Sequence, residues 1–211
     1  MMPIRPDREY RTMPVMSPAT EKRIDSDYYV EGYATTFNEP YLLWQEEGYK
    51  FYEQVDRNAF DNADLSDVIF LRNHEGKCLA RNKMKKGVAP TLILEPRDEG
   101  LFVAADLGLT VEGRNEYEAI ASGLVYQMSF AFTVADDVIE KIGDNEYKRT
   151  IRSFSKVFDV SSVDVPANPG TVIDIKARSA FEGFIESEKQ ELLRAEAREA
   201  QKKRIKLLSE V

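Results

Sequence analysis

A histidine, a serine and an aspartate in this 211-residue sequence could together perform nucleophilic catalysis. His74 is the only histidine; it follows an apolar run over residues 68–71 and precedes a Glu-Gly pair. This order predicts that the imidazole sits at the end of a strand, just before a turn. Imidazole has an ordinary pKa of about 6.5, which suits proton transfer near neutral pH. Taken alone, a histidine in this position is more often a surface or capping residue.

Ser129 lies in an apolar stretch, residues 123–132, that predicts a buried strand. Strand alternation puts Ser129 on the face opposite Met128 and Phe130. A rigid element suits a nucleophile, which must stay within hydrogen-bond reach of its base. The same pattern also fits an inert core serine bonded to a neighbouring carbonyl. No Gly-x-Ser-x-Gly motif surrounds Ser129, so an α/β-hydrolase is not indicated.

Asp159 lies in a β-branched run that breaks into a turn at Pro166. Strands disfavour aspartate, and a buried carboxylate needs a partner. Orienting a catalytic imidazole is one such partnership, while a salt bridge or a solvent-facing position is the alternative. Asp164, just before the turn, is interpreted as a turn or capping residue. Taken residue by residue, each position keeps its alternative; convergence of His74, Ser129 and Asp159 at one site would allow acyl transfer.

Two other chemistries compete with this interpretation. Cys78, the only cysteine, could act as a thiolate beside His74, but four residues in one turn give poor attack geometry, and an inert, half-buried thiol is favoured. A carboxylate pair could be drawn from the 37 acidic residues, but most of these lie in turns and in the tail, where solvation explains them.

Composition excludes several classes of function. One cysteine and one histidine cannot make a Cys/His zinc site, and no EF-hand loop is present, so we expect no cofactor or metal. The net charge of −8 argues against nucleic-acid binding, which needs lysines and arginines to replace counterions. No stretch approaches the roughly 20 apolar residues that span a bilayer, and no secretory signal is recognisable, so synthesis inside a cell without membrane insertion is expected.

The body of the chain is predicted to be mainly β, with fold class α+β, because short runs rich in Val, Ile, Tyr, Phe and Thr alternate with turn residues. The predicted strands cover residues 28–36, 50–55, 67–71, 91–96, 101–107, 124–135, 146–151 and 157–163, with hairpin turns at 98–100 and 143–145. Short helices are predicted over residues 57–63 and 113–121. A long helix is predicted over residues 177–208, which are rich in Glu, Lys, Arg, Ala and Leu.

This pattern predicts three parts. Residues 1–26 form a flexible N-terminal segment, with an edge strand within residues 8–15 as its one ordered piece. Residues 27–176 form the catalytic domain, and residues 177–211 form a helical tail. The ragged apolar stripe of the tail favours a solvated helix or connector over a coiled coil.

Several short motifs, in order, resemble the prohead serine protease family of tailed phages. They lie between residues 28 and 172 and comprise Val30-Glu31-Gly32-Tyr33-Ala34, Phe37-Asn38, Asn58-Ala59-Phe60, Leu71-Arg72-Asn73-His74-Glu75, Gly100-Leu101 with Ala104, Gly123 with Met128-Ser129-Phe130, Asp159-Val160-Ser161-Ser162-Val163 and Pro166-Ala167-Asn168-Pro169.

The resemblance implies a fold similar to the herpesvirus assembly proteases, a closed β-barrel with surrounding helices. It implies His74 as the base and Ser129 as the nucleophile, so we expect both to converge with Asp159 at one solvent-reachable site and to perform acyl transfer. Asp159 stands where the family usually has Glu, which shortens the reach of the carboxylate by one methylene. The herpesvirus proteases use a second histidine as third member; since this chain has one histidine, its third member is acidic or absent.

The resemblance also implies a serine endopeptidase that acts in the host cytoplasm, inside the assembling prohead. Its partners would be the major capsid protein precursor and its scaffolding segment, and it would often cut itself. The herpesvirus proteases suggest a homodimer as one option for the oligomeric state. The alternative is a catalytically silent capsid-assembly module that binds scaffold protein, although the intact residues 74, 129 and 159 speak against it.

Overall fold

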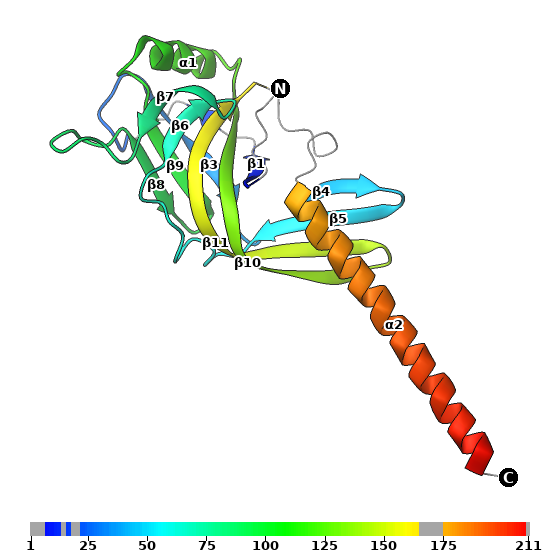
Figure 1. Ribbon diagram of the computed structural model, residues 1–211. Helices are drawn as coiled ribbons and strands as arrows, with labels where there is room; N and C mark the ends of the chain where they lie inside the picture. Colours follow the sequence, from blue (N-terminus) through cyan, green and yellow to red (C-terminus); the bar gives the residue numbers. More distant parts are fainter. Residues whose placement is uncertain (1–6, 14–15, 18–21, 165–174, 210–211) are drawn as a thin grey trace. The chain divides into compact units, whose positions relative to one another are not determined.

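The computed structural model describes residues 7–13, 16–17, 22–164 and 175–209, and within these residues strands predominate over two helices (Figure 1). The chain divides into two compact units, Met1–Asp174 and Ile175–Val211. The first unit contains all the described strands and the helix α1. The predicted α+β, mainly β class is therefore confirmed.

The larger sheet is built around two long strands, β10 (Gln127–Gly143) and β11 (Glu146–Val163), which form an antiparallel hairpin (Figure 1). Its order is β1-β10-β11-β5-β4; β6 pairs with another part of β11, and β7 pairs with β6. The bounds are β1 Glu9–Met13, β4 Tyr41–Glu46, β5 Tyr49–Val55, β6 Ile69–Arg72 and β7 Glu75–Arg81. Both β5 and β6 pair with β11 in parallel, one along each half of the strand.

The smaller sheet has the order β2-β3-β9-β8 and is antiparallel throughout. Its strands are β2 Met16–Ser17, β3 Tyr29–Thr36, β8 Leu92–Pro96 and β9 Gly100–Asp106. Side chains from both sheets and from α1 (Val111–Ala121) share one hydrophobic core. That core packs against the part of β10 and β11 that carries Ser129 and Asp159.

Aromatic packing fixes the backbone beside residue 129. Phe130 and Phe132 are fully buried, as the strand alternation predicts, and their ring centroids lie 4.6 Å apart. Phe132 also contacts Phe154 of β11 edge to face, with 4.8 Å between ring centroids. Burial of each such side chain stabilises the fold by about 1.5–3 kcal/mol. Phe130, the residue after Ser129, is therefore held by neighbouring aromatic rings in a close-packed interior.

The predicted closed barrel is not confirmed, because the described strands form two open sheets. Between β7 and β8, a backbone hydrogen bond runs from Thr91 N–H, just before β8, to the Arg81 carbonyl at the end of β7 (3.0 Å), but no ladder pairs these two described strands. A barrel requires continuous pairing around the ring.

One of the two short predicted helices is wrong. Residues 57–62 form consecutive turns. The carbonyl of Ala59 accepts a hydrogen bond from Phe154 N–H of β11 (2.9 Å), so it is drawn away from helical pairing. The other predicted helix is present as α1, which begins at Val111 because the Thr110 side chain caps it and accepts from Gly113 N–H (3.0 Å).

The second unit contains one continuous helix, α2 (Ile175–Ser209), where the sequence predicts a helix over residues 177–208. At 1.5 Å per residue it is about 52 Å long. Most of its described side chains are exposed. Neither described helix is both long and apolar enough to cross a membrane. Residues 1–6, 14–15 and 18–21 of the N-terminal segment predicted to be flexible, and the turn predicted at Pro166, lie outside the described residues; the edge strand predicted within residues 8–15 corresponds to β1.

Four buried charged side chains meet where β1, β5 and β11 come together, and we call Glu9, Arg11, Glu53 and Arg149 the ionic cluster. Arg11 Nη2 donates to Glu53 Oε2 (2.7 Å) and to Glu9 Oε2 (3.0 Å). Arg149 Nη1 donates to the same two oxygens, at 3.0 Å and 2.6 Å. Two carboxylates and two guanidinium groups balance, so no net charge is buried.

The ionic cluster makes the fold sensitive to acid. Burial opposes ionisation of Glu53, but Arg11, Arg149 and the Tyr41 hydroxyl outweigh it, and the pKa of Glu53 lies below its ordinary value of 4.5. A carboxyl group with a lowered folded-state pKa stabilises the fold above its unfolded pKa, and that stabilisation is lost as pH falls through the folded pKa. We expect the melting temperature of the wild type to fall more steeply below about pH 4.5 than that of Glu53→Gln. Asp136→Asn, in an exposed ion pair with Arg152, is the control and should keep the wild-type slope; identical slopes for wild type and Glu53→Gln would contradict this role for Glu53.

Candidate active site

His74 lies within a two-residue turn that joins β6 to β7, whose end residues Arg72 and Glu75 pair with each other. Asn73 and His74 both have positive φ angles, 51° and 59°. A tight hairpin of the primed type requires positive φ at both central residues, and Asn and His tolerate that region better than most side chains. The sequence predicts the imidazole before a turn; the structure places it inside the turn, which aims it back over the sheet.

The end of β11 holds this turn in place. Asn73 N–H donates to the Ser162 carbonyl (2.8 Å). Asn73 Nδ2 donates to Asp164 Oδ2 (2.9 Å), and Asp164 N–H donates back to Asn73 Oδ1 (3.1 Å). These contacts with Asn73, together with Arg72, hold the pKa of Asp164 below its ordinary value. The contacts of Asp164 therefore help to position His74, whereas the Pro166 turn to which the sequence assigns Asp164 lies outside the described residues.

Sheet register brings Ser129 and Asp159 to the same face. Ser129 of β10 lies opposite Ser161 of β11, and Ala131 lies opposite Asp159. Residues two apart on a strand point to the same side, so Asp159 and Ser161 share the face of Ser129. The parallel neighbour β6 pairs with the same stretch of β11 and ends at the turn that holds His74.

The three side chains singled out in the sequence meet in this arrangement. His74 Nε2 is 2.7 Å from Ser129 Oγ, and His74 Nδ1 is 2.5 Å from Asp159 Oδ1. Aspartate reaches the imidazole despite its shorter side chain, because β6 and β11 are adjacent strands. The arrangement can hold the imidazole in the tautomer that leaves Nε2 free to accept the serine proton.

One expectation about the site is wrong: Ser129 is not solvent-reachable in this arrangement. Its exposed fraction is 0%, and the side chain of His74 is 1% exposed. A cavity of about 290 Å³ opens beside His74 and Asp159, but Ser129 is not among the residues that line it. Tyr10 of β1 covers the imidazole edge to face, with ring centroids 4.7 Å apart.

Ser161 is a member of the site that the sequence reasoning did not single out. Its Oγ donates to Asp159 Oδ1 (2.9 Å), accepts from the backbone N–H of His74 (3.2 Å) and lies 3.2 Å from His74 Nδ1. It is fully buried. The spacing of two from Asp159 along a predicted strand is the signal that could have identified it.

Cys78 stands apart from this geometry. It lies on the exposed part of β7, and its Sγ donates to the Ala80 carbonyl (3.2 Å). The sulfur itself is partly enclosed, and this burial raises the pKa of the thiol. A raised pKa disfavours the thiolate that a cysteine nucleophile needs, and both ring nitrogens of His74 contact Ser129 or Asp159.

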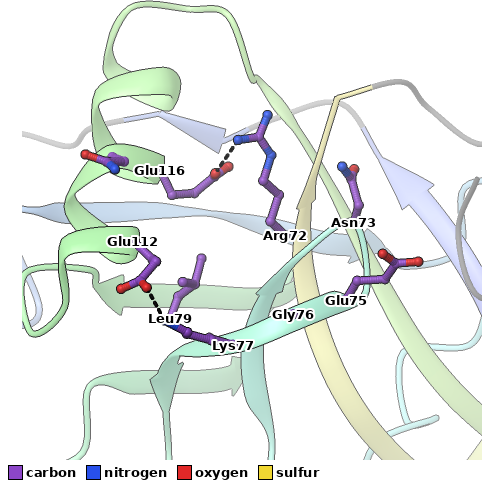
Figure 2. Close-up of a pocket in the computed structure, with 9 residues that line it drawn as sticks. Arg72, Asn73, Glu75, Gly76, Lys77, Leu79, Glu112 and Glu116 are labelled. Atoms are coloured by element: carbon purple, nitrogen blue, oxygen red, sulfur yellow. Dashed lines mark hydrogen bonds and ion pairs between the residues drawn. The ribbon is translucent and has the colours of Figure 1, made fainter.

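A second cavity, of about 470 Å³, lies between the β6–β7 hairpin and α1 (Figure 2). Arg72 pairs with the buried Glu116 (3.4 Å), and Lys77 pairs with Glu112, as the dashed lines in Figure 2 show. Glu116 Oε1 also accepts from Ser162 Oγ (2.6 Å). The contacts of Glu116 with Arg72 and Ser162 connect α1 to β6 and β11 next to the turn that carries His74.

Comparison with known families places the chain in one class. Residues 16–183 match the model of the caudovirus prohead serine protease family. The match covers most of the chain, so the chain belongs to this family, whose name denotes a serine peptidase of phage capsid maturation. Comparison with curated proteins and with solved structures finds no match.

Proposed function

We propose that this chain is a serine endopeptidase that cleaves the major capsid protein precursor and its scaffolding segment during prohead maturation, with Ser129 as nucleophile. Membership of the caudovirus prohead serine protease family supports the class of activity. The observation that carries the assignment of residues is the contact of Ser129 Oγ with His74 Nε2 (2.7 Å), backed by Asp159 on the opposite ring nitrogen.

The proposed mechanism is acyl transfer. His74 Nε2 takes the Ser129 proton as Oγ attacks a peptide carbonyl, and the resulting imidazolium gives that proton to the leaving amine. Water then repeats the sequence and releases the acyl group. Asp159 keeps the Nδ1 proton of His74 in place and stabilises the imidazolium while it exists.

The unit Met1–Asp174 contains all of these residues and would be the protease domain. The place of action would be the interior of the prohead in the host cell, where the precursor and scaffold are concentrated. The same chemistry would act on the chain itself. A homodimer is a further part of this proposal, as in the herpesvirus proteases.

Co-expression with the matching capsid precursor tests the proposal. We expect the wild type to shorten the precursor and the mass of the 24.1 kDa chain to fall by self-processing, both measured by mass spectrometry. The Ser129→Ala variant should leave both masses unchanged. An unshortened precursor together with stable binding of wild type to scaffold would instead favour the catalytically silent assembly module.

Ser161 is expected to act as a positioning residue. Ser161→Ala removes a donor to the Asp159 carboxylate, and a hydrogen bond to a charged group contributes about 1.5–3 kcal/mol, so we expect kcat to fall roughly tenfold or more with KM unchanged. Ser162→Ala is the matched control: its hydroxyl contacts Glu116 (2.6 Å) instead of the imidazole, so kcat should stay at the wild-type value. Equal kcat values for Ser161→Ala and Ser162→Ala would refute the positioning role.

A further inference from the structure

The N-terminal strand β1 is the immediate neighbour of the strand that carries Ser129. It forms one edge of the larger sheet and pairs antiparallel with β10, with Thr12 opposite Ser129 and Tyr10 opposite Ala131. Successive side chains of a strand point to opposite faces. One face of β1 therefore lies over the candidate active site, and the other faces away from it.

The face over the site closes it. The Tyr10 ring contacts the His74 ring, and Arg8 Nη1 lies 4.0 Å from Asp159 Oδ2. A nucleophilic attack needs the reacting atoms at about 3–3.5 Å. With Ser129 fully buried, a peptide carbonyl cannot approach Oγ while β1 and its side chains stay in place.

Charged side chains on the opposite face of β1 attach the strand to β5 and β11. Glu9 and Arg11 belong to the ionic cluster with Glu53 and Arg149. When a strand leaves, its charged groups are hydrated by water again, whereas buried apolar side chains are exposed to water at a cost in free energy. An attachment through charged groups is therefore easier to reverse. If β1 leaves, Arg149 Nη1 still contacts Glu53 Oε2 (3.0 Å), and neither charge is left without a counter-charge.

Two buried polar atoms at β1 lack hydrogen bonds while the strand is paired with β10. Thr12 Oγ1 and Arg8 Nε are buried and have no hydrogen-bond partner within the described part of the chain. Unpaired buried polar atoms cost free energy, which hydration would recover on release. Thr12 lies on the face of β1 over the site, and Arg8 is the residue just before the strand, with its Nε 3.8 Å from Asp7 Oδ2.

The family comparison separates β1 from the shared catalytic body. The match to the caudovirus prohead serine protease family begins at residue 16, after β1 ends at Met13. His74, Ser129, Asp159 and Ser161 all lie inside the matched range. β1 lies outside that range and covers the site, as expected of a segment added to the shared body.

We propose that β1 is an intramolecular cover that keeps Ser129 inaccessible, and that release of β1 from β10 opens the site to its protein substrate. The inference rests on the proposed function of Ser129. It predicts that the folded chain alternates between a closed, inactive arrangement and an open, active one, and that activity follows the open fraction.

A reversible crosslink between β1 and β10 tests the proposal in the full chain. Met13→Cys and Met128→Cys, combined with Cys78→Ser, place two thiols on antiparallel partners of β1 and β10, whose Cα atoms lie about 4.5–5.5 Å apart and suit a disulfide; Tyr10 stays in place over His74. Oxidised by glutathione disulfide, this variant should cleave the capsid precursor at least about 100-fold more slowly than after reduction. Cys78→Ser alone should be indifferent to the oxidant. Equal cleavage rates for the oxidised and reduced crosslink variant would overturn the proposal.

A second measurement does not depend on catalysis. In the full chain with Ser129→Cys and Cys78→Ser, the thiol at position 129 should react slowly with iodoacetamide. Adding the charge-balanced pair Glu9→Ala and Arg11→Ala should speed alkylation by at least about tenfold, because β1 is released more often. Alkylation that is equally fast in both proteins overturns the cover. If this alkylation difference is found but the wild-type chain does not cleave the precursor, the proposed protease function is overturned and the cover remains supported.

Discussion

Ser129→Ala is expected to lower kcat for precursor cleavage by about 10⁶-fold, as loss of the nucleophile does in other serine proteases. The substitution removes the only hydroxyl within hydrogen-bond reach of His74 Nε2 among the described contacts. The side chain is small and sits on a strand whose neighbours pack in the core, so the variant should stay folded. Kinetics on purified precursor, with a thermal melt of each protein, measures both effects.

Cys78→Ala is the control for this substitution. The thiol lies on β7 and donates to the Ala80 carbonyl, so its loss should leave kcat within the error of the wild type. An active Ser129→Ala combined with an inactive Cys78→Ala would move the nucleophile to the thiol.

Asp159→Asn is expected to lower kcat by about 10⁴-fold, because an amide in place of the carboxylate favours the wrong imidazole tautomer. An asparagine can donate to Nδ1 of His74, and the ring then carries its proton on Nε2, where it cannot accept from Ser129. Steady-state kinetics against the capsid precursor at neutral pH gives the comparison.

Two further variants help to explain a loss of kcat in Asp159→Asn. Asp159→Glu restores the carboxylate that the family resemblance leads us to expect at this position, and it should recover part of the activity lost in Asp159→Asn. Asp136→Asn changes an exposed acid of β10 that pairs with Arg152, and it should behave as wild type. Wild-type kcat in Asp159→Asn would mean that the site works without a third member.

Periodicity predicted most of the strands because their buried faces alternate in the sequence. β7 escaped detection because Glu75 to Cys78 are exposed and polar, and its position is fixed by pairing with β6. The two strands predicted over residues 146–151 and 157–163 are one strand, β11, since polar residues between them occupy a continuous ladder. The turns at residues 57–62 were missed because a carbonyl on Ala59 pairs with distant Phe154.

The candidate site was predictable in part. The residue types at 74, 129 and 159 indicate the chemistry, and the order of motifs indicated the family. The closure of the site was not predictable, since it depends on the pairing of residues 9–13 with residues 128–132. No local pattern in β1 signals which strand it joins. The role of Ser161 likewise depends on register between strands far apart in sequence.

The pairing of β11 with both β5 and β6 has a consequence for synthesis of the chain. The candidate site needs a turn at residue 74, a strand at 129 and a strand at 159–161, and β11 is the last of these to be made. At bacterial elongation rates of about 5–20 residues per second, the imidazole waits several seconds for its carboxylate. A ribosome-bound nascent chain therefore carries no assembled candidate site until β11, the last described strand, emerges, so under the proposed function it could not cut itself or other proteins before then.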